Sequence, residues 1–191
     1  AKAKGYETWQ IAKSKNNFSL FIKPLENLIN LRKQEANQIE GTGSCWETLA
    51  QPFEPNISIA RLEEMFLPIR NRLPIILEKI RTENFRFKPN WDLTEANQKK
   101  LCDVLLDSWG RKNEITKLSI SPHPFSITLG PKDFRITTRI VPGQPFSCFL
   151  ATAHEWGHSL YEQGLPQSEQ WFPWPLGEAT SMGVHESQSL F

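Results

Sequence analysis

Apolar residues in the first half of the chain recur at the spacing that places them on one face of a helix. This pattern predicts helices over residues 18–39, 58–80 and 94–109. Pro68 and Pro74 should kink or divide the second of these, because proline cannot donate the backbone hydrogen bond that a helix interior needs. Residues 51–56, with two prolines and an asparagine, predict a linker. Nothing before residue 110 indicates chemistry, so this half is interpreted as a helical scaffold.

Beyond Gly110 the pattern changes to a partial alternation of β-branched and aromatic residues with polar ones. Residues 118–128 and 133–141 therefore predict a two-stranded hairpin that turns at the intervening Leu-Gly-Pro-Lys. Two further helices are expected, over residues 146–163 and from about residue 176 to the end of the chain. Gly164 should end the first of them. The predicted fold class is mainly α, with a small β-hairpin or sheet beside the helix that follows it.

Length and composition narrow the class of protein. The 191 residues suffice for a single domain. Within it we expect a helical scaffold over residues 1–110, and the hairpin with the metal-binding helices over residues 111–191. The net charge of +1 gives no basic footprint for nucleic acid. No apolar run reaches the roughly 20 residues of a membrane span. The three cysteines lie far apart in the sequence, which argues against a disulfide framework. The first segment lacks the basic and then apolar layout of a secretory signal. Both observations favour a cytoplasmic location.

The chemistry of this chain is concentrated after residue 120, where all four histidines lie. Residues 154–158 read His-Glu-Trp-Gly-His, and positions four apart on a helix differ by only about 40° around its axis. His154 and His158 can therefore bind one zinc ion. Glu155 points about 100° away from His154, which suits a general base acting on a metal-activated water. The alternative is an ordinary surface helix; the apolar neighbours and Gly157, which permits close backbone approach, favour the metal site.

A catalytic zinc site also needs a third protein ligand. Three downstream residues could supply it: Glu178, His185 and Glu186. Glu178 follows His158 at the spacing typical of thermolysin-like enzymes. The two glutamates would lie about 12 Å apart along a helix, so only one of them can bind the ion. Spacing alone leaves the choice open.

Four short motifs follow one another in the second half of the chain. They are His123-Pro124-Phe125, a D-x-R-x-T pattern at residues 133–137, the H-E-x-x-H pattern at 154–158, and His-Glu-Ser-Gln at 185–188. In this order the motifs closely resemble those of the carboxypeptidase Taq family of thermostable metallocarboxypeptidases. The first half of the chain resembles the family more loosely.

The resemblance implies a function and a set of roles. His154, His158 and Glu186 would be the metal ligands, and Glu155 the general base. The family releases single amino acids from peptide C-termini with broad specificity, using zinc or cobalt, on a largely helical fold split by a long groove. The resemblance also implies peptide substrates and a homodimer. The charge balance and the lack of a long apolar run give no reason to expect a nucleic-acid or membrane partner. An edge strand of the small sheet could pair with an extended peptide.

Four other residues are weaker candidates for substrate binding. Arg135 and Arg139 could hold a carboxylate, although Arg135 could equally form an internal ion pair with Asp133. His123 could stabilise an oxyanion or line the groove, or it could simply cap the hairpin. His185, beside the expected ligand Glu186, could orient a ligand or bind substrate, or it could be an ordinary core histidine.

Members of the family are more than twice as long as this chain, so we expect it to be a fragment truncated at both ends. The segment before His123 lacks the acidic residue usual in the family, and Trp156 is bulkier than expected between the two histidines. A complementary C-terminal chain would then be needed to complete the groove. The alternatives are an inactive truncated or split-gene remnant and a related helical metallo-endopeptidase.

Overall fold

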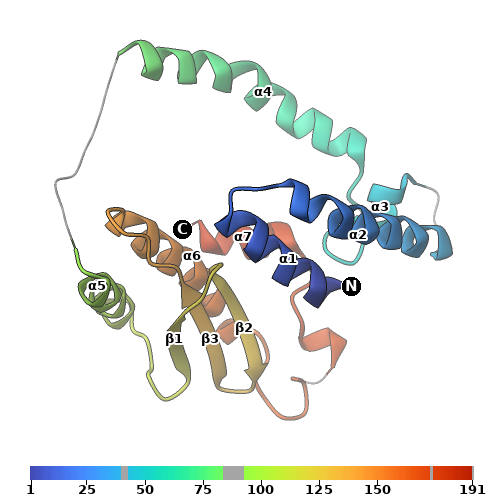
Figure 1. The fold of residues 1–191 in the computed structure, drawn as a ribbon. Coiled ribbons are helices and arrows are strands. Elements are labelled where there is room, and N and C mark those ends of the chain that lie inside the picture. Colours follow the sequence, from blue (N-terminus) through green and yellow to red (C-terminus); the bar gives the residue numbers. More distant parts are fainter. Residues whose placement is uncertain (40–42, 84–92, 173, 191) are drawn as a thin grey trace. The chain divides into compact units, whose positions relative to one another are not determined.

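Helices dominate both of the units into which the chain divides, and the second unit also holds a small sheet (Figure 1). The computed structural model describes residues 1–39, 43–83, 93–172 and 174–190. The two units are Ala1–Asn84 and Phe85–Phe191. The predicted mainly α fold with a small sheet is confirmed. The division falls before the helix predicted over 94–109, which therefore belongs with the sheet.

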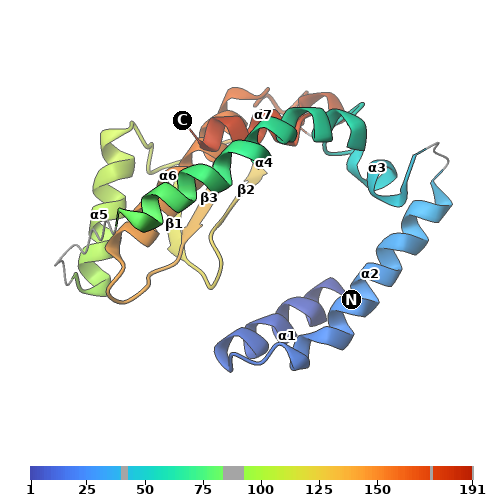
Figure 2. The same ribbon diagram turned by 90° about the horizontal axis from the view of Figure 1, so that it is seen from above.

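The first unit contains four helices in its described part. They are α1 (Lys2–Ser14), α2 (Ser19–Gln38), α3 (Cys45–Ala50) and α4 (Ile59–Thr82). Helices α1 and α2 pack side by side as a hairpin (Figure 2). Gly5 lies at their contact, where an added Cβ would come within 2.8 Å of the Leu28 side chain. Helices α1 and α3 are additional to the predicted ones, because their short sequences carry little helical periodicity.

Glu47 joins the beginnings of two helices. Its carboxylate accepts a hydrogen bond from the backbone N–H of Ser44, whose hydroxyl in turn accepts one from the Glu47 N–H, so the two residues form a capping box on α3. The same carboxylate accepts from the Ile59 N–H at 2.9 Å, where α4 begins. The hydrogen bond from Ile59, followed by those from Ser44, lowers the pKa of Glu47.

Helix α4 contains both Pro68 and Pro74, yet it runs unbroken (Figure 1). The prediction offered a kink or a division at the two prolines, and the division is wrong. Each proline removes one backbone donor, but the other residues of a 24-residue helix retain theirs and keep the helix continuous. No described helix in the chain is long and apolar enough to cross a membrane.

The second unit holds the sheet and the helices that carry the candidate chemistry. Its elements are α5 (Glu95–Ser108), β1 (Thr116–Ile120), β2 (Phe125–Gly130), β3 (Asp133–Thr138), α6 (Pro145–Gly164), a 3-10 turn η1 (Pro175–Gly177) and α7 (Met182–Ser189). Helix α6 agrees with the predicted helix and ends at Gly164, as expected. The final helix was predicted to begin near residue 176, but α7 begins only at Met182. Ser181 accepts a hydrogen bond from the Val184 N–H and caps α7 there.

The sheet has three strands in the order β1-β3-β2, which corrects the predicted two-stranded hairpin. Strands β2 and β3 form the expected antiparallel hairpin, whereas β1 pairs with β3 in parallel. The single strand predicted over residues 118–128 is thus two strands, separated by a crossing loop that contains Pro122 and Pro124. Thr137 on β3 anchors this loop: its hydroxyl lies 2.7 Å from that of Ser121 and accepts from the Phe125 N–H at 3.0 Å.

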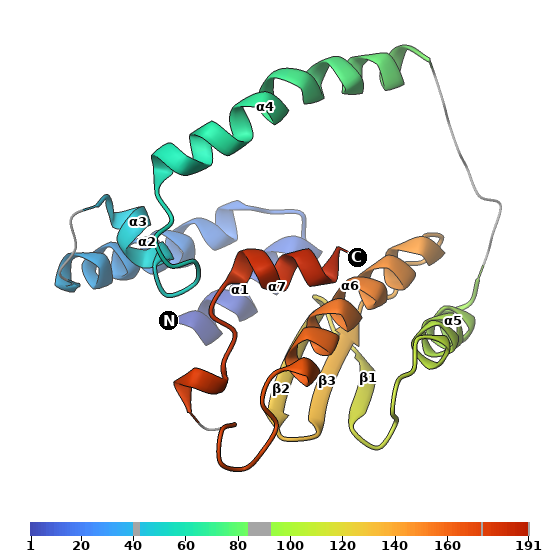
Figure 3. The same cartoon turned by 180° about the vertical axis from the view of Figure 1, so that it is seen from behind.

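Helix α6 lies against one face of the sheet and contacts both β2 and β3 (Figure 3). Its core contact is made by Trp156, which packs with Leu106 of α5 and Ile136 of β3, all three almost fully buried. The bulk of Trp156 between the two histidines therefore has a structural use. It anchors the helix on the sheet and fixes the direction in which its other faces point.

Replacing Ile136 by alanine should lower the free energy of unfolding by about 2–5 kcal/mol, because the substitution leaves a cavity between Leu106 and Trp156. Ile127→Ala on the edge strand β2, where the side chain is 46% exposed, is the matched control and should cost much less. Chemical denaturation followed by tryptophan fluorescence measures both. Equal losses for the two variants would show that this core does not hold the second unit together.

Candidate metal centre

Helix α6 places His154 and His158 next to each other, as their spacing predicts. Their rings lie 4.7 Å apart between centroids and are nearly perpendicular, at 84°. His158 is buried, whereas the His154 side chain is 37% exposed. One histidine thus lies under α7 and the other at the surface, so a position between them can be reached from outside.

Helix α7 brings Glu186 to the same place. Its Oε2 atom lies 3.5 Å from Nε2 of His158 and 3.8 Å from Nε2 of His154. Two ligands bound tetrahedrally to zinc at 2.0–2.1 Å are about 3.4 Å apart. Within the described residues, these three side chains form the group able to hold a metal ion, with all three ligand atoms within 4.8 Å of one another. Their spacing and chemistry fit a zinc-like ion.

Gly157 makes the approach of α7 possible. A Cβ added at this position would lie 2.4 Å from the Gln188 carbonyl oxygen and 2.6 Å from Cα of Ser189. The backbones of α6 and α7 are therefore in direct contact one residue before His158 and two residues after Glu186. Ser189 also lies 2.9 Å from Oε2 of Glu186, so its hydroxyl can donate to the carboxylate.

Glu155 lies on the face of α6 that is turned toward the sheet, and its side chain is only 7% exposed. Burial raises the pKa of this carboxyl above its ordinary value; His154 and a hydrogen bond with Ser126 of β2 offset part of the rise, and Glu186 adds to it. A buried carboxylate with a raised pKa, next to a metal group, has the properties of a general base. Sequence reasoning missed Ser126, which only the packing of β2 on α6 brings to Glu155.

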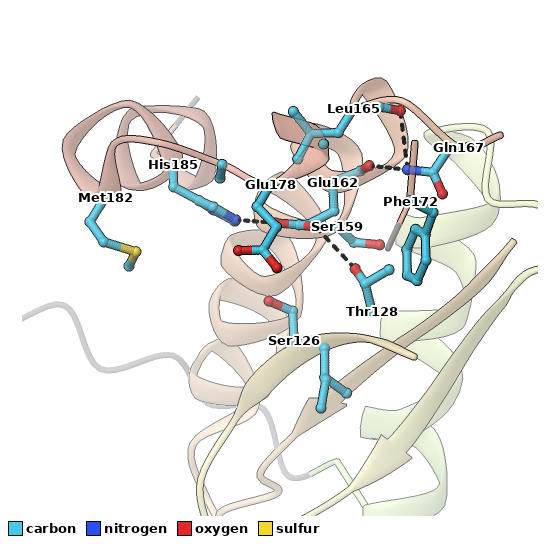
Figure 4. Close-up of a pocket in the computed structure, with 13 residues that line it drawn as sticks. Ser126, Thr128, Ser159, Glu162, Leu165, Gln167, Phe172, Glu178, Met182 and His185 are labelled. Atoms are coloured by element: carbon cyan, nitrogen blue, oxygen red, sulfur yellow. Dashed lines mark hydrogen bonds and ion pairs between the residues drawn. The ribbon is translucent and has the colours of Figure 1, made fainter. Parts of the chain in front are cut away.

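His185 is a neighbour of His158 and also of Glu162 on the next turn of α6. Its Nδ1 lies 2.6 Å from Nδ1 of His158, and its Nε2 lies 2.8 Å from Oε1 of Glu162. Thr128 of β2 donates to the other oxygen of Glu162 at 3.2 Å (Figure 4). Burial, followed by the nearby His185, lowers the pKa of His158, which favours the neutral ring that binds metal. The sequence carried a usable signal for Glu162, which lies one helical turn after His158.

Glu178 lies outside the metal group, on the segment between η1 and α7. It lines a cavity of about 570 Å³, together with Glu162, His185 and Phe172 (Figure 4). It is not a member of the group formed by the two histidines and Glu186. In the arrangement of the described residues, α7 thus carries Glu186, and not Glu178, to the two histidines.

The remaining candidates lie on or beside the sheet. Arg135 makes a bidentate ion pair with Asp133, at 2.6 and 3.0 Å, so the alternative of an internal pair is the one observed. Arg139 is half-buried just after β3. His123 is exposed in the crossing loop, where its carbonyl oxygen accepts from the Ser121 hydroxyl at 2.6 Å. The substrate-binding roles of these residues stay predictions.

A mainly helical fold, with an H-E-x-x-H helix facing a glutamate from a later helix, is an arrangement expected of a metallopeptidase. The family model of the carboxypeptidase Taq (M32) metallopeptidases matches residues 1–191. The chain belongs to this family, which confirms the resemblance found in its motifs.

Named relatives agree with this assignment. The chain is 31% identical to Thermostable carboxypeptidase 1 of Thermus thermophilus and 32% identical to Carboxypeptidase 1 of Bacillus subtilis, in each case over 99% of its own length. Its fold is similar to that of the BsuCP crystal structure, with a TM-score of 0.87 and 30% identity over 98% of the chain. The chain spans only 38–39% of the length of these proteins.

Proposed function

We propose that this chain carries the metal centre of a carboxypeptidase that releases single amino acids from the C-termini of peptides. The observation that supports this most directly is the group of His154, His158 and Glu186, with the buried carboxyl of Glu155 beside it. Zinc is the metal we propose, with cobalt as an alternative, because two imidazoles and one carboxylate suit both ions. The family and the named relatives support the same activity.

Different residues of the chain would have different roles in peptide hydrolysis. A divalent metal at this site would polarise the scissile carbonyl and acidify the attacking water. Glu155 takes the proton of that water and then gives it to the leaving amine. Ser126 holds the Glu155 carboxyl from the side of the sheet. The apolar cavity of about 730 Å³ beside His154, lined partly by Trp109 and Leu150, would exclude water from a bound peptide.

The length of the relatives bears on whether this chain acts alone. A groove that holds a peptide needs two walls, and correct orientation contributes much of the rate. We therefore propose that the chain alone has weak or no activity, and that a complementary C-terminal chain supplies the rest. By analogy with the family we also propose a homodimer and a cytoplasmic location. Arg135, Arg139 and His123 stay candidates for contact with the substrate.

The test is peptide hydrolysis by the zinc-loaded chain, alone and with a polypeptide corresponding to the part of Bacillus subtilis Carboxypeptidase 1 that follows its matched region. Mass spectrometry should show products shortened one residue at a time from the C-terminus. Glu155→Gln should lower this rate by about 10²–10⁴-fold, because the amide cannot accept the proton, while metal binding is retained.

Other product patterns would contradict the proposal in recognisable ways. Internal cuts would identify a metallo-endopeptidase. Unchanged peptide in both conditions, with zinc bound, would identify an inactive remnant. Rapid hydrolysis by the chain alone would overturn the need for a complementary chain, and equal rates for Glu155→Gln would remove Glu155 from its proposed role.

A further inference from the structure

Behind the metal group, an unbroken line of hydrogen bonds runs from His158 to the sheet. Nδ1 of His158 faces Nδ1 of His185 at 2.6 Å, Nε2 of His185 faces Glu162 at 2.8 Å, and Thr128 donates to the far oxygen of Glu162. Both nitrogens of His185 are thus engaged, one with His158 and the other with Glu162. The side chain of His185 is 12% exposed and that of Glu162 is 27% exposed.

The carboxylate of Glu162 determines which atom donates and which accepts in each hydrogen bond of this line. An ionised carboxylate can only accept hydrogen bonds, so Nε2 of His185 carries the proton that it shares with Glu162. Nδ1 of a neutral His185 is then an acceptor, and Nδ1 of His158 must be the donor. A neutral His158 with its proton on Nδ1 has a free lone pair on Nε2. That is the atom 3.5 Å from Glu186, in the metal group.

The opposite tautomer of His158 would be unsuitable for metal binding. Its proton would lie on Nε2, the atom that has to bind the metal. Its Nδ1 would then carry a lone pair that faces the lone pair on Nδ1 of His185, and the two would repel each other. His185 could relieve this contact only by moving its proton to Nδ1, which would leave its Nε2 lone pair facing the carboxylate. Glu162, acting through His185, therefore favours this tautomer of His158 without touching that residue, and a hydrogen bond from His158 to the backbone of His185 adds to the preference.

The geometry also restricts the orientation of both rings. The rings of His185 and Tyr161 meet edge to face, with the ring centroids 4.9 Å apart and the planes at 74°. His158 and Glu162 are one turn apart on α6, so the helix itself sets the separation that His185 bridges. His185 directly precedes Glu186 on α7. The bridge thus also ties the helix that carries the carboxylate ligand to the helix that carries the two histidines.

We propose that Glu162 and His185 are positioning residues that set the tautomer and the ring orientation of His158 for metal binding. This inference rests on the metal site of the proposed function and adds two residues to it. Hydrogen-bonded partners of this kind commonly change metal affinity by 10–100-fold. Neither residue contacts the substrate in this role. His185, left open by its sequence position between an orienting and a substrate-binding role, is assigned the first.

The test uses the whole chain and measures two properties of the site, the tautomer of each histidine and the affinity for Co²⁺. Long-range proton–nitrogen correlation spectra of the metal-free chain report which ring nitrogen of each histidine carries the proton. Titration with Co²⁺ alone, followed by visible absorption, measures the affinity. In the unmodified chain, His158 should be protonated on Nδ1 and His185 on Nε2.

Two variants interrupt the line at different points. His185→Phe keeps a ring against Tyr161 but removes both nitrogens. It should weaken Co²⁺ binding by 10–100-fold, and part of the His158 rings should carry the proton on Nε2. Glu162→Gln keeps the shape of the side chain, but its amide can donate as well as accept. It should weaken binding by about tenfold and give a mixture of tautomers. Glu178→Gln, a change of the same kind in the same cavity, is the control and should alter neither readout.

Each outcome decides the proposal. It is overturned if His158 in the unmodified chain is protonated on Nε2, or if His185→Phe and Glu162→Gln bind Co²⁺ as tightly as the unmodified chain. It is also overturned if the unmodified chain binds no Co²⁺, since there is then no ligand to position. Metal binding with the expected tautomers but without peptide hydrolysis would support the positioning role and contradict only the proposed activity.

Discussion

Replacing Gly157 by alanine should separate α7 from α6 and lower metal affinity more than tenfold. The new Cβ would meet backbone atoms of Gln188 and Ser189 at 2.4–2.6 Å, and backbone cannot move aside as a flexible side chain can. Since Glu186 lies on the same short helix, any shift of α7 moves the carboxylate away from His154 and His158. Overpacking of this kind also costs about 1–3 kcal/mol of stability.

Gly164→Ala is the matched control for this substitution. It lies on the same helix, and no atom lies within 4 Å of its added Cβ. It should leave Zn²⁺ affinity unchanged, and it should leave stability unchanged or slightly raised. Competition with a coloured chelator measures the affinity, and chemical denaturation measures the stability. If Gly157→Ala bound Zn²⁺ like Gly164→Ala, the contact between α6 and α7 would not govern the site.

Removing the carboxylate of Glu186 should abolish stable metal binding, whereas removing that of Glu178 should not. Glu186 contributes one of only three ligand atoms in the group. Its loss should therefore exceed the roughly 10–100-fold effect of removing a residue that acts only through a ligand. Elemental analysis of the dialysed chain should give near one zinc per chain for the unmodified protein and for Glu178→Ala, and almost none for Glu186→Ala.

The opposite pattern would change the assignment of the site. Zinc lost with Glu178→Ala and kept with Glu186→Ala would indicate the spacing of a thermolysin-like enzyme, and it would contradict the geometry of α7. Zinc absent from all three forms would mean that residues 1–191 do not hold the ion by themselves. In that case the complementary chain of the proposed function would also be needed for metal binding.

Much of the candidate site could be predicted because it depends on one helix. The rise and turn of an α-helix place His154 and His158 on one face whatever surrounds them. The same geometry separates Glu155 from both, and it would have placed Glu162 one turn beyond His158. Gly157 was recognised as a place of close approach, although not what approaches it. These are local relations, and local backbone geometry is sufficient to derive them.

The errors in predicting the fold came from interactions between distant segments. The parallel pairing of β1 with β3 joins strands that are separated in sequence by β2, and no periodicity reports it. Thr137 holds the crossing loop through its side chain, so the loop depends on a contact with a residue far along the chain. One error was local instead: helix α4 continues through two prolines because its other backbone hydrogen bonds remain.

The sequence by itself therefore determined the helix with its two histidines, the mainly helical class and, through four motifs, the family. Helical spacing left open which glutamate joins the histidines, and the motif resemblance pointed to Glu186. The tertiary structure brings Glu186 beside them, because α7 docks on α6 at Gly157. The tertiary structure also joined His158, His185 and Glu162 into one line of hydrogen bonds. The physical reason is the distance along the chain over which each kind of interaction acts. Helical spacing acts over a few residues, whereas a metal centre is completed by side chains that only packing brings together.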